Sequence, residues 1–167
     1  MLEELKETSK NFDEGMVLGQ GGQGTIYKGI LPNDRVVAIK RSRIFNPNQI
    51  ENFINEVMML SQINPRNVVK PLGCCLESEV PLLVYEFIPN GTVYEHLHDH
   101  GQFLRLTWKI RLQIATETGG VLACLDSATS TPIYIDVKTE NILLDYNLTA
   151  KVSDFGVSRL FLLIKLN

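Results

Sequence analysis

The stretch MVLGQGGQGTIYKGILPNDRVVAIKRS, residues 16–42, decides the fold. Its first part alternates apolar residues with polar or small ones on both sides of a glycine-rich turn, which predicts two strands joined as a hairpin. The PND sequence at 32–34 predicts a second turn, and the β-branched run after it predicts a third strand over 35–42. Two more strand-like runs follow, VVKPLGCCL at 68–76 and PLLVYEFI at 81–88. The sequence therefore predicts a five-stranded antiparallel sheet.

Helical patterns lie on both sides of these strands and between them. Residues 1–11 predict a short amphipathic helix. Asn46 and Pro47 resemble an N-cap and a first helical residue, and apolar residues then recur at helical spacing, which predicts a helix over 47–63. One helix is thus expected inside the sheet region.

The second half of the chain predicts longer helices and shorter strands. Thr92 and Glu95 have the spacing of a capping box that begins a short helix. Thr107 begins a longer helix that is expected to run to about Leu125. Short strands are expected at 132–135, 142–145 and 150–152.

The elements predict an α+β fold in three parts. A flanking helix occupies residues 1–11, a sheet-rich lobe occupies 12–88, and the first part of a helical lobe occupies 89–167. A hinge between the two lobes is expected near 86–91.

Composition and charge exclude several classes of partner. The 167-residue chain has a net charge of −3 and no basic run, so nucleic acid is not an expected partner. Its longest apolar runs, such as residues 160–164, are far shorter than the roughly 20 residues that span a bilayer. The N-terminus is charged and lacks the apolar core of a secretory signal. We therefore expect a cytoplasmic domain without a membrane segment.

Gly19, Gly21 and Gly24 form a G-x-G-x-x-G pattern, which is weak evidence alone because dinucleotide-binding turns and ordinary hairpins share it. A dinucleotide-binding turn would lead into a helix, whereas this chain continues as the strand GTIYKGIL. A backbone without side chains can approach a triphosphate closely and offer amide donors. The context favours a hairpin that covers phosphates, with a plain hairpin as the alternative.

Charged residues that suit phosphate and metal chemistry follow in order. Lys40 ends VVAIK, and Glu56 in the next predicted helix can pair with it while the ammonium group contacts the α and β phosphates. Asp154, in VSDFGVSR, offers the oxygen ligand that Mg²⁺ prefers. Each signal is modest alone, and their order along the chain makes them specific.

Four segments together resemble a eukaryotic protein kinase, and more closely a plant receptor-like kinase of the wall-associated type. They are LGQGGQGTIYKGIL, FINEVMMLSQINPRNVVKPLGCC, PLLVYEFIPNGTVYEHLH and NILLDYNLTAKVSDFGVSR. The resemblance covers nearly all of residues 12–159 and implies a kinase-like fold: a five-stranded antiparallel N-lobe with one long helix, then part of a helical C-lobe. It also implies ATP and Mg²⁺ as cofactors, protein serine or threonine as substrate, and a place on the cytoplasmic side of a membrane-anchored receptor.

The resemblance further implies roles for individual residues. Asp136 would orient the acceptor hydroxyl, and Lys138 is typical of the serine/threonine type of kinase. Glu56 would hold Lys40 on the phosphates, so that Lys40 and Glu56 complete a catalytic group of four with Asp136 and Lys138. The magnesium ligands would be Asn141 and Asp154.

Nucleotide contacts are implied along the sheet and the hinge. Tyr85 would stand behind the adenine, and the hinge from Glu86 to Ile88 would offer backbone hydrogen bonds. The implied contacts are Leu18, Gly19, Gly21, Gly24, Ile26, Ala38, Lys40, Tyr85, Glu86 and Ile88.

The catalytic segment departs from the family pattern. Where kinases of this kind have His-Arg-Asp, the chain has Tyr134, Ile135 and Asp136, one residue short. Removing one residue from an extended segment turns the preceding side chains to the other face, which threatens the aim of Asp136. The spacing from Asp136 to Lys138 and Asn141 is intact.

The chain continues for only eleven residues after Gly156 and contains no A-P-E motif, so we expect a truncated catalytic domain. Three functions remain open from the sequence. The first is ATP-dependent phosphorylation of a protein serine or threonine. The second is a pseudokinase-like module that binds nucleotide without catalysis, and the third is a truncated gene product without function.

Overall fold

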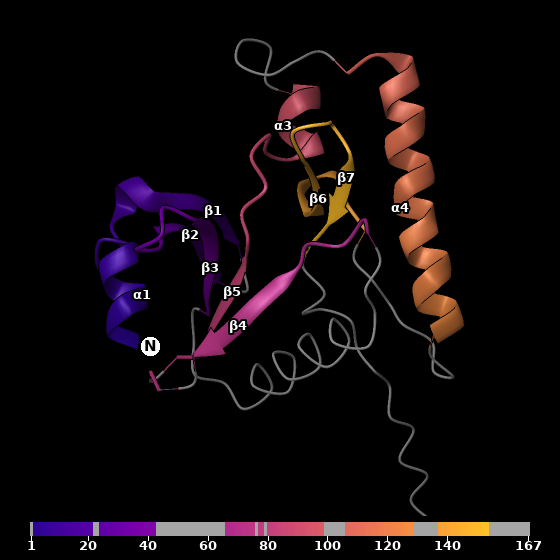
Figure 1. The fold of residues 1–167 in the computed structure, drawn as a ribbon. Helices are drawn as coiled ribbons and strands as arrows, with labels where there is room; N and C mark the ends of the chain where they lie inside the picture. Colours follow the sequence, from indigo (N-terminus) through magenta and orange to yellow (C-terminus); the bar gives the residue numbers. More distant parts are fainter. Residues whose placement is uncertain are drawn as a thin grey trace, which may run out of the picture. The chain divides into compact units, whose positions relative to one another are not determined.

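The computed structural model describes residues 2–21, 24–42, 66–75, 77–78, 80–98, 106–128 and 137–153 (Figure 1). These residues form two compact units. The first unit holds the described residues up to Ser42 together with Lys70–Phe87. The second holds those from Arg66 to Val69 and from Ile88 onward. The lobe limits expected from the sequence stay a prediction.

The first unit contains the expected five-stranded antiparallel sheet, with strand order β1-β2-β3-β5-β4. All five strands lie where the sequence predicts them. The helix expected over 47–63 lies outside the described residues. The strand bounds are β1 (Val17–Gly21), β2 (Gly24–Ile30), β3 (Val36–Ser42), β4 (Pro71–Cys75) and β5 (Leu82–Glu86).

One face of this sheet carries the core of the first unit. Helix α1 (Leu2–Thr8) packs Leu5 against this face, and Val37 and Ile39 of β3 are fully buried. Because strand side chains alternate between faces, residues that flank these two on β3 point to the opposite face. The buried cluster consists of Leu5, Val37, Ile39, Cys75 and Leu82.

The turn expected at 32–34 joins β2 to β3. The Leu31 N–H donates to the Arg35 carbonyl at 2.9 Å, and the Asp34 N–H donates to the Leu31 carbonyl at 2.9 Å. Asp34 has φ 61°, a conformation that Asp tolerates better than most residues. This turn sets the register in which Ile26 lies opposite Lys40.

The second unit begins with the predicted capping box. The Glu95 N–H donates to Thr92 Oγ1 at 3.2 Å, and Glu95 Oε2 accepts from the Thr92 N–H at 2.6 Å. The box opens helix α3 (Val93–His98). Helix α4 (Trp108–Ala128) starts after Thr107, as expected, and ends slightly beyond the predicted limit.

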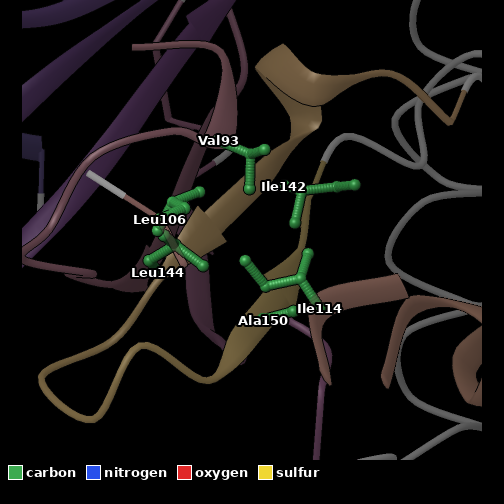
Figure 2. Close-up of a cluster of buried hydrophobic side chains, with 6 residues drawn as sticks. All are labelled: Val93, Leu106, Ile114, Ile142, Leu144 and Ala150. Atoms are coloured by element: carbon green, nitrogen blue, oxygen red, sulfur yellow. The ribbon is translucent and has the colours of Figure 1, made fainter. Parts of the chain in front are cut away.

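A short hairpin packs beside these helices. Strand β6 (Ile142–Leu144) pairs with β7 (Ala150–Val152), and the 3₁₀ helix η2 (Thr139–Asn141) leads into β6. The sequence predicts both strands, whereas the strand expected at 132–135 lies outside the described residues. Figure 2 shows the apolar cluster of this unit, made of Val93, Leu106, Ile114, Ile142, Leu144 and Ala150.

Helix α4 buries one side and exposes the other. Ile114, Val121 and Leu125 are almost fully buried, while Trp108 is 80% and Leu112 is 58% exposed. The apolar residues of this helix are therefore divided between a buried side and an exposed side.

Candidate functional site

The three glycines of the glycine hairpin have two different kinds of surroundings. A Cβ atom at Gly19 or Gly21 would have no neighbour within 4 Å, so open space lies beside the backbone of β1. A Cβ atom at Gly24 would lie 2.2 Å from the carbonyl oxygen of Arg41 on β3. Gly24 therefore permits close pairing of β2 with β3, while the first two leave β1 accessible.

The strand register places most of the predicted nucleotide contacts on one face. Ile26 lies opposite Lys40, and Ala38 lies opposite Tyr85. Gly19 lies opposite Ile26 and joins the same face. Residues directly opposite each other in an antiparallel pair project to the same side of a sheet.

This face is the one that the buried cluster leaves uncovered. Val37 and Ile39 alternate with Ala38 and Lys40 along β3, and both are fully buried in the cluster. Ala38 and Lys40 are only partly buried. Ala38 and Lys40 thus project from the same side of β3 and keep part of their surface exposed.

Leu18 is the one predicted contact of β1 whose face the register does not define. The pairing of β1 with β2 shifts between Val17 and Gly19, so Leu18 stands at an irregularity of the strand. Its side chain is 44% exposed. The sequence pattern contains no signal for this shift.

The predicted hinge begins with a two-point contact between Glu86 and Lys70. The Glu86 N–H donates to the Lys70 carbonyl at 3.0 Å, and Glu86 Oε1 accepts from the Lys70 N–H at 2.9 Å. Glu86 lies opposite Val37, on the sheet face away from Tyr85. The N–H and the side chain of Glu86 are therefore engaged with Lys70. Tyr85 and Ile88 are both buried.

Asn141, a predicted magnesium ligand, is held through its backbone by Lys138 and Ser153. Its N–H donates to the Lys138 carbonyl at 2.9 Å, and its carbonyl accepts from the Ser153 N–H at 2.8 Å and from Ser153 Oγ at 3.1 Å. Ser153 directly precedes Asp154 in the sequence. Asp154 itself, like Asp136 and Glu56, lies outside the described residues.

Strand β7, which leads to Ser153, is supported by residues that the sequence did not single out. Asn67 Nδ2 donates to the Ala150 carbonyl at 2.9 Å, and Glu117 Oε2 of α4 accepts from the Ala150 N–H at 2.7 Å. The Val152 N–H donates to the Asn67 carbonyl at 2.8 Å. Such partners are dozens of residues away in the chain, and no local pattern marks them.

Taken separately, the two units offer groups that suit phosphates and a divalent cation. In the first unit, Gly19 and Gly21 leave open space beside the backbone of β1, and Lys40 on the same sheet face carries a positive charge. Asn141 offers the amide oxygen that hard cations accept as a ligand. In the described part of the chain no group of three or more His, Cys, Asp or Glu residues is arranged to hold a metal.

Similarity to known proteins identifies the family of this chain. A family model described as protein tyrosine and serine/threonine kinase matches residues 12–163. Wall-associated receptor kinase 2 of Arabidopsis thaliana is 62% identical over 157 residues, which are 93% of this chain and 21% of the relative. Putative wall-associated receptor kinase-like 16 of the same plant is 60% identical over 159 residues, or 95% of this chain and 37% of the relative.

The chain therefore spans between about a fifth and two fifths of the length of these relatives. Among the described residues, no helix is long and apolar enough to cross a membrane. The family match covers the glycine hairpin, the whole sheet and the β6–β7 hairpin. The chain belongs to the protein tyrosine and serine/threonine kinase family, and within it is similar to the wall-associated receptor kinases.

Proposed function

We propose that the chain binds Mg-ATP and belongs to a catalytic domain that transfers the γ-phosphoryl group to a serine or threonine of a protein. The observation that carries the proposal is the shared sheet face of Gly19, Ile26, Ala38, Lys40 and Tyr85. The similarity to wall-associated receptor kinases supports the serine/threonine type and a place on the cytoplasmic side of a membrane receptor. Nothing in the composition suggests nucleic acid as a partner.

The sheet face supplies binding and orientation. Backbone N–H groups of the glycine hairpin would cover the phosphates, because side chains are absent where the chain must approach them. Lys40 would contact the α and β phosphates, with Glu56 as its partner. Leu18, Ile26 and Ala38 would line the adenine, with Tyr85 behind it and the backbone of 86–88 along its edge.

The proposed metal ligands and the residue that would position the acceptor come later in the chain. Asn141 and Asp154 would hold Mg²⁺, which neutralises charge on the phosphates. The hydrogen bonds from Ser153 to the Asn141 carbonyl support this pair, because they fix the chain just before Asp154. Asp136 would orient the acceptor hydroxyl, with Lys138 beside it.

The proposal is tested by titrating the protein with Mg-ATP in a calorimeter. We expect Lys40→Ala to weaken binding by roughly tenfold or more, since it removes hydrogen bonds to a charged group. Lys151→Ala, which removes the same charge from β7, is the matched control and is expected to bind as the unaltered chain does. Absence of binding at millimolar nucleotide would refute the proposal.

A second candidate function is nucleotide binding without transfer. The replacement of His-Arg by Tyr134 and Ile135 before Asp136 favours it, because those residues normally support the aim of the catalytic Asp. A displacement of even about 1 Å can lower the rate of transfer about a hundredfold. Transfer of labelled phosphate to a generic protein substrate, compared with Asp136→Asn, distinguishes the two: equal signals from both proteins support the second candidate.

A further inference from the structure

Phe12 joins two strands of the sheet on the face opposite Lys40. Its ring packs edge-on against Tyr27 of β2, with ring centroids 5.3 Å apart and an interplanar angle of 65°. The guanidinium carbon of Arg41, on β3, lies 4.9 Å from the centroid of the same ring. Phe12 also packs against the buried cluster below α1. One side chain thus contacts both β2 and β3.

The backbone that presents Phe12 is held in an uncommon conformation. Lys10, Asn11 and Phe12 have φ values of 51°, 57° and 58°, a left-handed region that residues with a side chain rarely enter in succession. Such a conformation persists only where its surroundings impose it.

Hydrogen bonds of the Ser9 side chain hold this turn. Its side chain is fully buried, and Ser9 Oγ donates to the Leu5 carbonyl at 2.7 Å while it accepts from the Phe12 N–H at 3.2 Å. The Asn11 N–H donates to the Lys6 carbonyl at 2.6 Å. The turn is therefore tied to α1, and α1 is tied to the sheet through Leu5. Together α1 and residues 9–12 form what we call the strap.

The strap acts on the strands that carry the proposed nucleotide contacts. Tyr27 directly follows Ile26 on β2, and Arg41 directly follows Lys40 on β3. Neighbouring residues of a strand project to opposite faces of the sheet. Phe12 therefore contacts the sheet directly behind Ile26 and Lys40, the two positions that face the proposed nucleotide. Ile26 and Lys40 are themselves opposite each other in the register.

We propose that Phe12 is a positioning residue for nucleotide binding, which sets the spacing of Ile26 and Lys40 through Tyr27 and Arg41. The inference rests on the proposed binding of Mg-ATP to this sheet. It extends that function to a residue that lies outside the glycine hairpin and does not touch the nucleotide face. The aromatic ring is the essential feature, because a cation above a ring and an edge-on ring pair both depend on it.

The test compares Phe12→Leu with Phe12→Tyr and Cys75→Ala. Phe12→Leu keeps an apolar side chain but removes the ring, and we expect the dissociation constant for Mg-ATP to rise roughly three- to tenfold. Phe12→Tyr keeps the ring and is expected to bind Mg-ATP as the unaltered chain does. Cys75→Ala removes a fully buried side chain of the same cluster from β4, and is expected to lower stability without changing affinity.

Hydrogen exchange provides a readout that does not require nucleotide. In Phe12→Leu, amides of β2 and β3 are expected to exchange faster, while those of β4 keep their rates. If Phe12→Leu and Cys75→Ala affect affinity and exchange equally, Phe12 has only a structural role and the inference is overturned. If the unaltered chain binds no Mg-ATP, the proposed function fails. Unchanged exchange of β2 and β3 in Phe12→Leu separately overturns the positioning role of Phe12.

Discussion

Gly24 illustrates how a single missing side chain permits two strands to pair. The carbonyl oxygen of Arg41 on β3 lies 2.2 Å from the place where a Cβ atom of residue 24 would lie, which is too close for a side chain. Gly19 and Gly21 have empty space at the same point and belong to the exposed side of the hairpin. The three glycines of one motif thus contribute separately to packing and to access.

Alanine substitutions should separate these contributions. We expect Gly24→Ala to lower the free energy of unfolding by roughly 1–3 kcal/mol, because β2 must shift away from β3. Gly19→Ala should be neutral or stabilising by up to about 1 kcal/mol, since the added methyl group meets nothing and the unfolded chain loses freedom. Urea unfolding measures both, and a similar loss in the two variants would contradict the assignment. Gly19→Ala is expected to weaken Mg-ATP binding although it does not lower stability.

At the scale of elements, helix α4 and strand β7 are joined by a hydrogen bond to a charged group. Glu117 Oε2 accepts from the Ala150 N–H at 2.7 Å, and Gln113 Nε2 donates to the other carboxylate oxygen at 2.9 Å. The Ala150 carbonyl also accepts a hydrogen bond from Asn67 Nδ2, and Ala150 is fully buried. The helix therefore fixes the peptide that begins β7.

Removal of this carboxylate should loosen the β6–β7 hairpin. We expect Glu117→Ala to lower the free energy of unfolding by about 1–2 kcal/mol, at the lower end for a charged hydrogen bond because the side chain is partly exposed. Glu117→Gln keeps an acceptor and should lose less. Thr116→Ala, at the neighbouring exposed position, is the control and should be neutral. Equal stability of Glu117→Ala and Thr116→Ala in chemical denaturation would disprove the role of the bond.

For the molecule as a whole, the sequence predicts the features that depend on local pattern. The alternation in 16–42 places three strands correctly, and the Thr92–Glu95 spacing forms the hydrogen bonds of a capping box. These succeed because each depends on residues that are close in the chain. Of the predicted site, the shared face of Ala38 and Lys40 follows from strand alternation in the same way.

The features that the sequence does not reveal depend on distant partners or on imposed backbone conformation. Glu117 and Asn67 meet Ala150 from 33 and 83 residues away, a pairing that no periodicity encodes. The left-handed turn at residues 10–12 contains no glycine, so the usual signal for positive φ is absent. The packing of Phe12 on Arg41 results from that turn, and the sequence pattern does not predict it either.

The exposed side of α4 can be checked in the intact chain, because Trp108 is its single tryptophan and is 80% exposed. We expect the fluorescence of the native protein to be red-shifted and readily quenched by iodide, as for an indole in water. Trp108→Gln should change the free energy of unfolding by no more than about 0.5 kcal/mol, because the position is at the surface. Ile114→Ala, at a buried position of the same helix, should cost about 2–5 kcal/mol. A blue-shifted emission that iodide does not quench would show that the indole is covered in solution, and a large loss of stability in Trp108→Gln would lead to the same conclusion.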